Sequence, residues 1–150
     1  MLKYTTAQVT FREIPDEVTL CINISNCPIH CPDCHSKELW EDAGTELTDE
    51  EMLRLLKENK GITCVCFMGY GNDFDRIIQL NKIIRDYYKD LISIALYTGN
   101  TKIYDGFDYI KVGPYIKEFG GLDKKTTNQR LYMRCANYWK DITYKFWKKN

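Results

Sequence analysis

The alternation of apolar and polar side chains along the chain predicts four strands. In residues 18–25 every second position is apolar, which is typical of a strand with one buried face. Residues 62–68 are apolar throughout and are bounded by glycines, which predicts a strand covered on both faces. Residues 91–98 and 107–112 form two further short apolar runs. These runs provide the strands of one sheet.

Two segments between these strands have the pattern of amphipathic helices. Thr48 and Glu51 have the spacing of a capping box, and Gly61 is a plausible stop, so residues 49–60 are predicted to form a helix. In residues 73–89 apolar side chains recur every three or four positions, which predicts a second helix. Its apolar stripe consists of Ile77, Leu80, Ile84 and Tyr87, widened by Ile78 and Ile83.

Strands that alternate with helices predict an α/β fold with a mostly parallel sheet. The periodicity does not decide between a sheet curled into a barrel and an open, doubly wound sheet. In both folds the loops at the carboxyl ends of the strands form the site, so the loops after residues 18–25 and 62–68 should face one cavity. Towards the end of the chain, residues 113–121 look like a loop, and residues 141–147 alternate weakly, like a late edge strand.

Length and composition favour a folded chain with a single domain over residues 1–150. The residues are 44% hydrophobic and 28% charged, and the N-terminus has neither a signal peptide nor a membrane anchor, so a cytoplasmic location without membrane binding is expected. The 21 basic and 21 acidic residues balance, so there is no overall charge to attract nucleic acid. The lysines near the C-terminus are interpreted as a solvated surface.

Seven cysteines are many for a chain in a reducing compartment, and they indicate metal or redox chemistry. Three of them, Cys27, Cys31 and Cys34, fall within eight residues. The others are interpreted as small buried hydrophobic residues, with the role of Cys135 left open. This second group consists of Cys21, Cys64, Cys66 and Cys135.

The spacing of Cys27, Cys31 and Cys34 lets one short loop hold three corners of an iron-sulfur cluster. The fourth iron would then lack a protein ligand and be open to another molecule. The alternative is a zinc site in which His30 or His35 completes the three thiolates. The motif follows a predicted strand of an alternating chain rather than forming a small autonomous unit, which favours the cluster.

Three cysteines separated by three and then two residues resemble the radical S-adenosylmethionine superfamily at every ligand position, although the aromatic residue often found before the third cysteine is replaced by Asp33. The resemblance implies a partial (β/α) barrel of the radical S-adenosylmethionine type and one [4Fe-4S] cluster. In this superfamily S-adenosylmethionine chelates the open iron and is cleaved to a 5'-deoxyadenosyl radical. No catalytic residue beyond the cluster ligands is identified.

Over most of its length the chain also resembles the activating proteins of anaerobic ribonucleoside-triphosphate reductases, which are glycyl-radical-enzyme activases. This resemblance implies an oxidoreductase that removes a glycine α-hydrogen from the large subunit of a partner reductase. It also implies a low-potential electron donor of the flavodoxin or ferredoxin type. The matching pieces are His35-Ser36, Leu39-Trp40, FMGYGND at 67–73, YTG at 97–99, DYIKVGPY at 108–115 and TTNQR at 126–130.

The resemblance further implies where S-adenosylmethionine binds. The family commonly has two adjacent glycines and an acidic residue after the second strand, to receive the methionine amino group. This chain has a different sequence there, which leaves two alternatives. Either the backbone of Gly69 and Gly71 is expected to do most of the binding of the methionine end, or Asn72 or Asp73 is expected to replace the usual acid. Thr98, within the YTG piece, is a further candidate contact.

Two other functions remain open from the sequence. The activase is favoured, but the cysteine loop reports the cofactor and not the substrate, so a radical S-adenosylmethionine enzyme acting on another small molecule or a peptide is an alternative. A non-catalytic zinc or iron-sulfur module is the third possibility.

Overall fold

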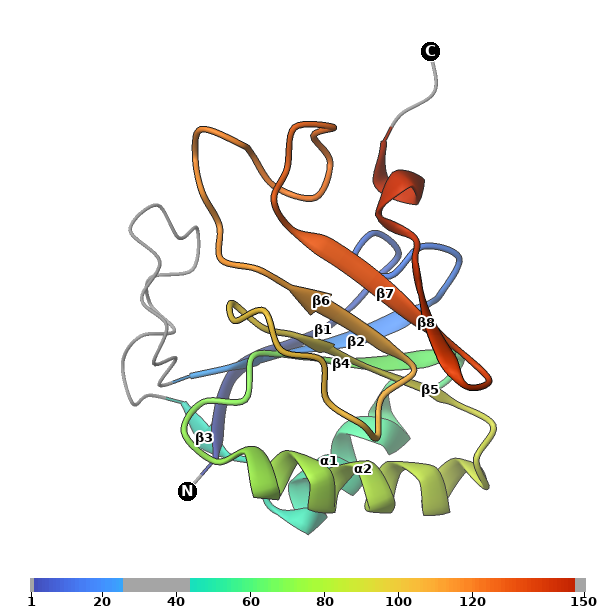
Figure 1. Cartoon of the computed structure of the whole chain (residues 1–150). Helices are drawn as coiled ribbons and strands as arrows, with labels where there is room; N and C mark the ends of the chain where they lie inside the picture. The colour runs from blue at the N-terminus through green and yellow to red at the C-terminus, as the bar shows by residue number, and fades with distance from the viewer. Residues whose placement is uncertain (1, 26–43, 148–150) are drawn as a thin grey trace.

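The computed structural model describes residues 2–25 and 44–147, which form one sheet with two α-helices packed against it (Figure 1). Neither helix in these ranges is long and apolar enough to cross a membrane. In chain order the elements are β1 (Lys3–Thr10), β2 (Thr19–Ile24), β3 (Thr45–Glu46), α1 (Asp49–Glu58), β4 (Cys64–Met68), α2 (Phe74–Tyr88), β5 (Ser93–Tyr97), β6 (Tyr109–Val112), β7 (Arg130–Cys135), β8 (Tyr138–Asp141) and the 3-10 helix η2 (Thr143–Phe146).

The sheet of the described residues has eight strands in the order β3-β1-β2-β4-β5-β6-β7-β8. Only the central strands β2, β4, β5 and β6 pair in parallel, and every pairing outside them is antiparallel. The predicted mostly parallel sheet, curled into a partial (β/α) barrel, is therefore wrong. The physical reason is that antiparallel strands extend both edges of the parallel centre, and β7 and β8 are reached without a described helix, so the sheet stays mixed and open.

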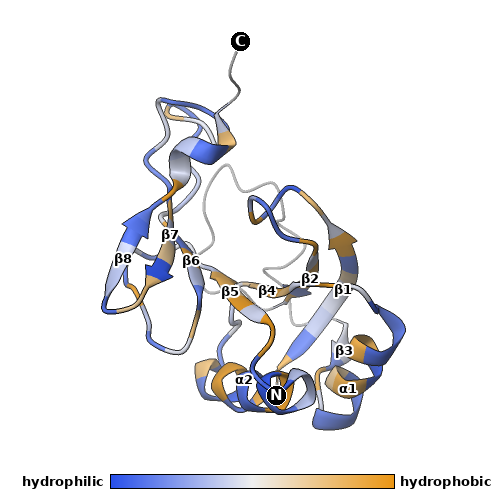
Figure 2. Ribbon diagram, turned by 90° about the vertical axis from the view of Figure 1, so that its right-hand side faces the viewer, coloured by the Kyte–Doolittle hydropathy of each residue, from blue (hydrophilic) through white to orange (hydrophobic). Residues whose placement is uncertain are grey.

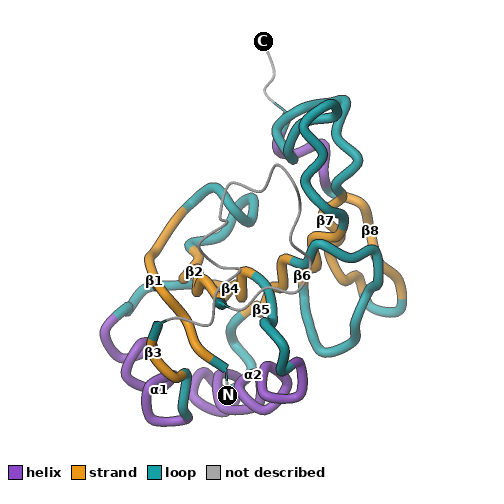
Figure 3. Tube along the Cα trace, turned by 90° about the vertical axis from the view of Figure 1, so that its left-hand side faces the viewer, coloured by secondary structure: helices purple, strands orange, loops and turns teal. Residues whose placement is uncertain are grey.

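Both helices cover the same face of the sheet, and the opposite face carries loops instead. Figure 2 shows α1 and α2 together below the sheet, and Figure 3 shows the long connection between β6 and β7 rising on the other side. We call this second side the helix-free face, because no α-helix of the described residues covers it. The core on the helix side includes Leu20, Ile22, Val65, Phe67, Leu80 and Ile94. The core on the helix-free face includes Cys21, Cys66, Ala95, Tyr109 and Leu131, covered by Ile14 and Ile142.

The start of α1 shows how local sequence and tertiary contacts combine. The Thr48 hydroxyl accepts a hydrogen bond from the Glu51 amide at 3.1 Å, as expected for an N-cap. The Glu51 carboxylate accepts hydrogen bonds from the Tyr4 hydroxyl and, at 2.7 Å, from Nε of Arg54. Arg54 is the largest cause of the lowered pKa of Glu51, which falls to about 2. Glu51 thus ties the helix to β1 in addition to its place in the capping sequence.

The four predicted strands and the two predicted helices are all confirmed, with ends that shift by one or two residues. The segment 141–147, predicted as an edge strand, contains the 3-10 helix η2 instead. Within that segment, Thr143 is fully buried, and its hydroxyl accepts a hydrogen bond from the Leu131 amide at 2.8 Å. This bond belongs to a turn that packs on the sheet and does not extend it.

The strand β4 provides a direct test of this core. Phe67 is fully buried on the helix side, whereas Leu91, before β5, is 86% exposed. We expect Phe67→Ala to lower the free energy of unfolding by about 3–5 kcal/mol, because it removes a large side chain and leaves a cavity. Leu91→Ala is the matched control and should change it by no more than about 0.5 kcal/mol. Urea unfolding followed by circular dichroism measures both, and equal losses would contradict the described packing.

Candidate functional site

The carboxyl ends of the four parallel strands meet at one edge of the sheet. Asn23, Met68, Tyr97 and Lys111 are register partners on β2, β4, β5 and β6, so they form a single row across the sheet. Alternation along each strand places this row on the helix-free face. The loops that follow these residues therefore emerge side by side, at the position where open α/β sheets bind ligands.

Main-chain hydrogen bonds join the loops at this edge. The Gly69 amide donates to the Tyr97 carbonyl at 2.8 Å, which links the turn after β4 to the end of β5. The Thr98 amide donates to the Lys111 carbonyl at 2.9 Å, and the Gly113 amide donates to the Asn100 carbonyl at 2.7 Å. These bonds continue the ladder beyond the last residues of β5 and β6. The three loops are consequently held in fixed positions relative to one another.

The turn after β4 requires glycine at two positions for different reasons. Gly69 has a φ of +95° and Gly71 a φ of +59°, and both values disfavour a residue with a side chain. A Cβ atom on Gly69 would meet nothing within 4 Å, whereas one on Gly71 would lie 2.9 Å from the Ser25 carbonyl oxygen. Gly71 thus lets the turn pack closely against the residue that follows β2.

The other predicted cofactor contacts occupy distinct settings. Asn72 is exposed at the tip of the turn. Asp73 is the N-cap of α2, and its Oδ1 accepts a hydrogen bond from the Arg76 amide at 3.1 Å. Thr98 is 3% exposed, and its hydroxyl accepts from the Asn100 amide at 3.2 Å. The edge therefore brings the Gly69–Asp73 turn and Thr98 together.

Asn100 is a residue of this edge that the sequence reasoning did not identify. Its Nδ2 donates hydrogen bonds to the Tyr70 hydroxyl at 3.1 Å and to the Tyr104 hydroxyl at 3.0 Å. The rings of Tyr70, Phe74 and Tyr104 also pack against one another, with centroids 4.5–6.2 Å apart. Asn100 therefore ties the loop after β5 to the turn after β4 through side chains.

Lys111 is the second such residue. It is only 9% exposed, and its Nζ donates to the carbonyls of Gly113 at 2.9 Å and Thr98 at 3.2 Å. The ammonium also lies 5.8 Å from the centroid of the Tyr97 ring. A lysine inside the apolar strand Tyr109–Val112 was the available signal, because charged side chains are rarely buried without a specific reason. Lys111 brings a positive charge to the edge.

Three of the remaining cysteines lie below this edge, in the interior. Cys21, Cys64 and Cys66 are buried, as predicted, whereas Cys135 is partly exposed. Cys21 and Cys66 are register partners, and the Cys66 Sγ lies 3.7 Å from the Met68 Sδ. Burial raises the pKa of the Cys64 and Cys66 thiols, so they stay protonated and are poor metal ligands.

The predicted cluster ligands Cys27, Cys31 and Cys34 lie outside the described residues, as do His30 and His35. Within residues 2–25 and 44–147, no three side chains of His, Cys, Asp or Glu come together in a group that could hold a metal ion. The described part of the chain therefore supplies the edge at the end of β2, the strand that the cysteines follow in the sequence.

Comparison with known protein families gives a match to an iron-sulfur family. A family model described as a 4Fe-4S single cluster domain matches residues 17–107, a range that begins just before β2, includes the three closely spaced cysteines and ends before β6. The comparisons with curated proteins and with solved structures found no match.

The two glycines of the turn generate a prediction about stability. Gly69→Ala should lower the free energy of unfolding by about 1–2 kcal/mol, because only the positive φ opposes a side chain there. The loss in Gly71→Ala should exceed that in Gly69→Ala by ~1–3 kcal/mol, because the new Cβ atom also collides with the Ser25 carbonyl. Urea unfolding of the full chain measures both variants. A smaller loss for Gly71→Ala than for Gly69→Ala would contradict the close packing of this turn on the end of β2.

The two groups of cysteines generate a second prediction. Cys27→Ala, Cys31→Ala and Cys34→Ala should each remove most of the bound iron and sulfide, because each change removes one ligand of the predicted cluster. Cys66→Ala is the matched control and should retain both, since its thiol is buried. Iron and sulfide are measured after anaerobic reconstitution. Full iron content in Cys31→Ala would exclude this ligand set.

Proposed function

The chain belongs to the 4Fe-4S single cluster domain family, and from this membership we propose that it is a radical S-adenosylmethionine enzyme. The observation that carries the proposal is the spacing of Cys27, Cys31 and Cys34, which provides three thiolates and leaves one iron of a [4Fe-4S] cluster open. A zinc module in which a histidine completes the ligand set would leave no such position.

The chemistry of the donor set fits the cluster, since thiolates are its usual protein ligands. When bound, the cluster supplies one electron to the sulfonium of S-adenosylmethionine, whose carbon-sulfur bond then breaks to give methionine and a 5'-deoxyadenosyl radical. The protein contributes binding, orientation and exclusion of water. In this proposal those tasks fall to the carboxyl edge of the parallel strands, which includes the end of β2.

The turn after β4 supports binding of the methionine end of S-adenosylmethionine. An ammonium group donates hydrogen bonds, so it needs acceptors. The exposed Asn72 side chain carries an amide oxygen that is suited to this role, and main-chain carbonyls of the Gly69–Gly71 segment are further acceptors. Asp73 retains only part of its capacity, because its Oδ1 caps α2.

Lys111 and Thr98 support the orientation of a bound ligand. The Lys111 ammonium is held by two carbonyls on adjacent loops, so its position is fixed by the backbone. Such a preorganised charge favours an anionic group such as a carboxylate and requires no rearrangement when the ligand arrives. Thr98 is fixed by the same loops, which makes it a positioning residue in this proposal.

We further propose that the hydrogen atom removed is the α-hydrogen of a glycine in the large subunit of an anaerobic ribonucleoside-triphosphate reductase. This step transfers the hydrogen to the 5'-deoxyadenosyl radical and leaves the unpaired electron on the glycine. A flavodoxin or ferredoxin would supply the electron. The sequence resemblance supports this choice of substrate, and the small size of the chain agrees with it, because a partner loop could complete the site.

The experiment that tests this function uses the reconstituted protein, S-adenosylmethionine, a reductant and the reductase with its glycines deuterated at the α-carbon. We expect a carbon-centred radical on the reductase by electron paramagnetic resonance, and deuterium in the 5'-deoxyadenosine by mass spectrometry. Cleavage of S-adenosylmethionine without radical or deuterium transfer would reject the activase function and leave a radical S-adenosylmethionine enzyme with another substrate. Absence of cleavage would reject the wider proposal.

A further inference from the structure

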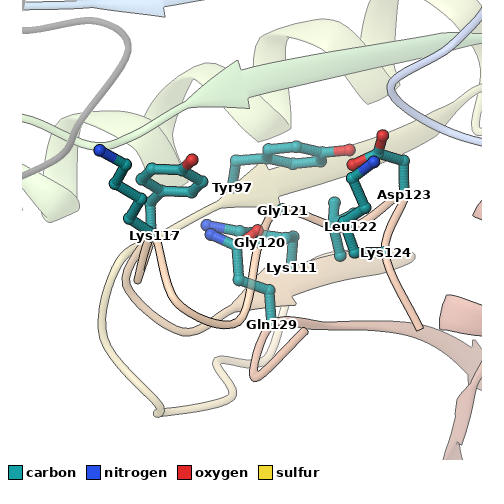
Figure 4. A pocket seen from close by; sticks show the side chains of 10 residues that line it. Tyr97, Lys111, Lys117, Gly120, Gly121, Leu122, Asp123, Lys124 and Gln129 are labelled. Carbon is teal, nitrogen blue, oxygen red and sulfur yellow. The ribbon is translucent and has the colours of Figure 1, made fainter. Parts of the chain in front are cut away.

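A cavity of about 530 Å³ opens on the helix-free face, between the ends of β5 and β6 and the connection that leads to β7 (Figure 4). Its floor includes Tyr97 and Lys111, and its walls include Lys117, Lys124 and Gln129. This volume falls within the range of small-ligand sites, roughly 300–1,000 Å³. The cavity shares Lys111 with the edge proposed to bind the cofactor, but no residue of the Gly69–Asp73 turn lines it.

The charge of the cavity is positive. Three lysines line it against a single carboxylate, that of Asp123, although the whole chain has a formal net charge of 0. Figure 4 shows Lys117 and Lys124 on opposite sides of the opening, with Lys111 between them. Lys117 and Lys124 are exposed, whereas Lys111 is buried. An anionic group that enters would therefore meet charges at the opening and at the floor.

A second cavity of about 570 Å³ lies next to the first, since Asp123 lines both. It has an apolar wall made by Phe11, Pro15 and Phe146, and Phe11 is 72% exposed. Its charged residues include Lys145 and Asp16, which pair with each other at 2.9 Å. The two cavities together present a positive portion and, beside it, an aromatic portion in which Arg12 and Lys145 balance the carboxylates of Asp16 and Asp123.

We propose that this double cavity binds an extended, acidic polypeptide segment of a partner protein. Carboxylate side chains of the segment pair with Lys117 and Lys124, and a neighbouring apolar side chain packs against Phe11. The inference rests on the proposed function, because it identifies how a macromolecular substrate is recognised next to the carboxyl edge. Aromatic rings are enriched at protein interfaces, and complementary charges at such a surface set specificity and association rate.

A small anion is a less suitable occupant of this surface. Sites for phosphate commonly present bidentate guanidinium groups or converging amides at a helix N-terminus, and neither lines the first cavity. The second cavity has one guanidinium, that of Arg12, but the carboxylates of Asp16 and Asp123 line it as well. Separate lysines at two sides of an opening instead suit carboxylates that are spaced along a chain. The exposed ring of Phe11 would gain nothing from a small anion, whereas it would be buried by a peptide.

The test measures binding of a short fluorescein-labelled peptide in which glutamate alternates with leucine, using fluorescence anisotropy and the full chain. The expected result is saturable binding that weakens as salt rises. Lys117→Glu and Lys124→Glu should each weaken it by about fivefold or more. Lys82→Glu on α2, which covers the other face, is the matched charge control and should bind as the wild type does. Phe11→Ala should weaken the leucine peptide more than an alanine counterpart.

Other outcomes overturn the inference. Equal affinity for a glutamine version of the peptide, or unchanged affinity in Lys117→Glu and Lys124→Glu, would exclude charge recognition here. Complete displacement of the peptide by inorganic phosphate at matched ionic strength would assign the cavity to a small anion, and displacement by S-adenosylmethionine would assign it to the cofactor. Cleavage of S-adenosylmethionine by the wild-type protein is measured separately, so failure of the proposed function and failure of this inference are distinguishable.

Discussion

Parallel pairing of β2, β4, β5 and β6 is the constraint on which the rest of the structure depends. Parallel strands need cover on both faces, and β4 shows this most clearly, since four of its five residues are buried. The helices cover one face, and loops and η2 cover the other. Because the four strands run the same way, their carboxyl ends meet at one edge. The proposed chemistry needs several loops to converge at one place, and this pairing supplies the convergence.

The edge is rigid because its loops share backbone hydrogen bonds. The turn after β4 is hydrogen-bonded to the end of β5. The loop after β5 is hydrogen-bonded to Gly113, at the start of the connection from β6 to β7. Asn100 adds a side-chain link between the first two loops. The main-chain carbonyls also hold the ammonium of Lys111, so its charge costs less to bury than an isolated one would. A site assembled in this way is preorganised before any ligand binds.

The central elements could be predicted from the sequence because their signals are local. The continuous apolar run of β4 and the apolar stripe of α2 report their own burial. The edge strands could not be found in this way, because β1 is partly or fully exposed at seven of its eight positions and β7 is mostly half-buried. Their antiparallel pairing depends on distant segments. That missing information is why the alternating pattern predicted a mostly parallel sheet, and why nothing in it opposed the barrel implied by the resemblance, where the sheet is mixed and open.

The candidate site shows the same division between local and distant information. Sequence alone indicates glycine at positions 69 and 71, yet only the structure shows that Gly71 makes room for the Ser25 carbonyl while Gly69 faces open space. Similarly, the lysine at position 111 is visible in the sequence, but its hydrogen bonds to Thr98 and Gly113 depend on how β5 and β6 align. Residue type therefore reports the chemistry that is available, whereas strand register decides which groups act together. The effects of substitutions at this edge are therefore best compared between two residues of the same type in different surroundings, such as Gly69 and Gly71.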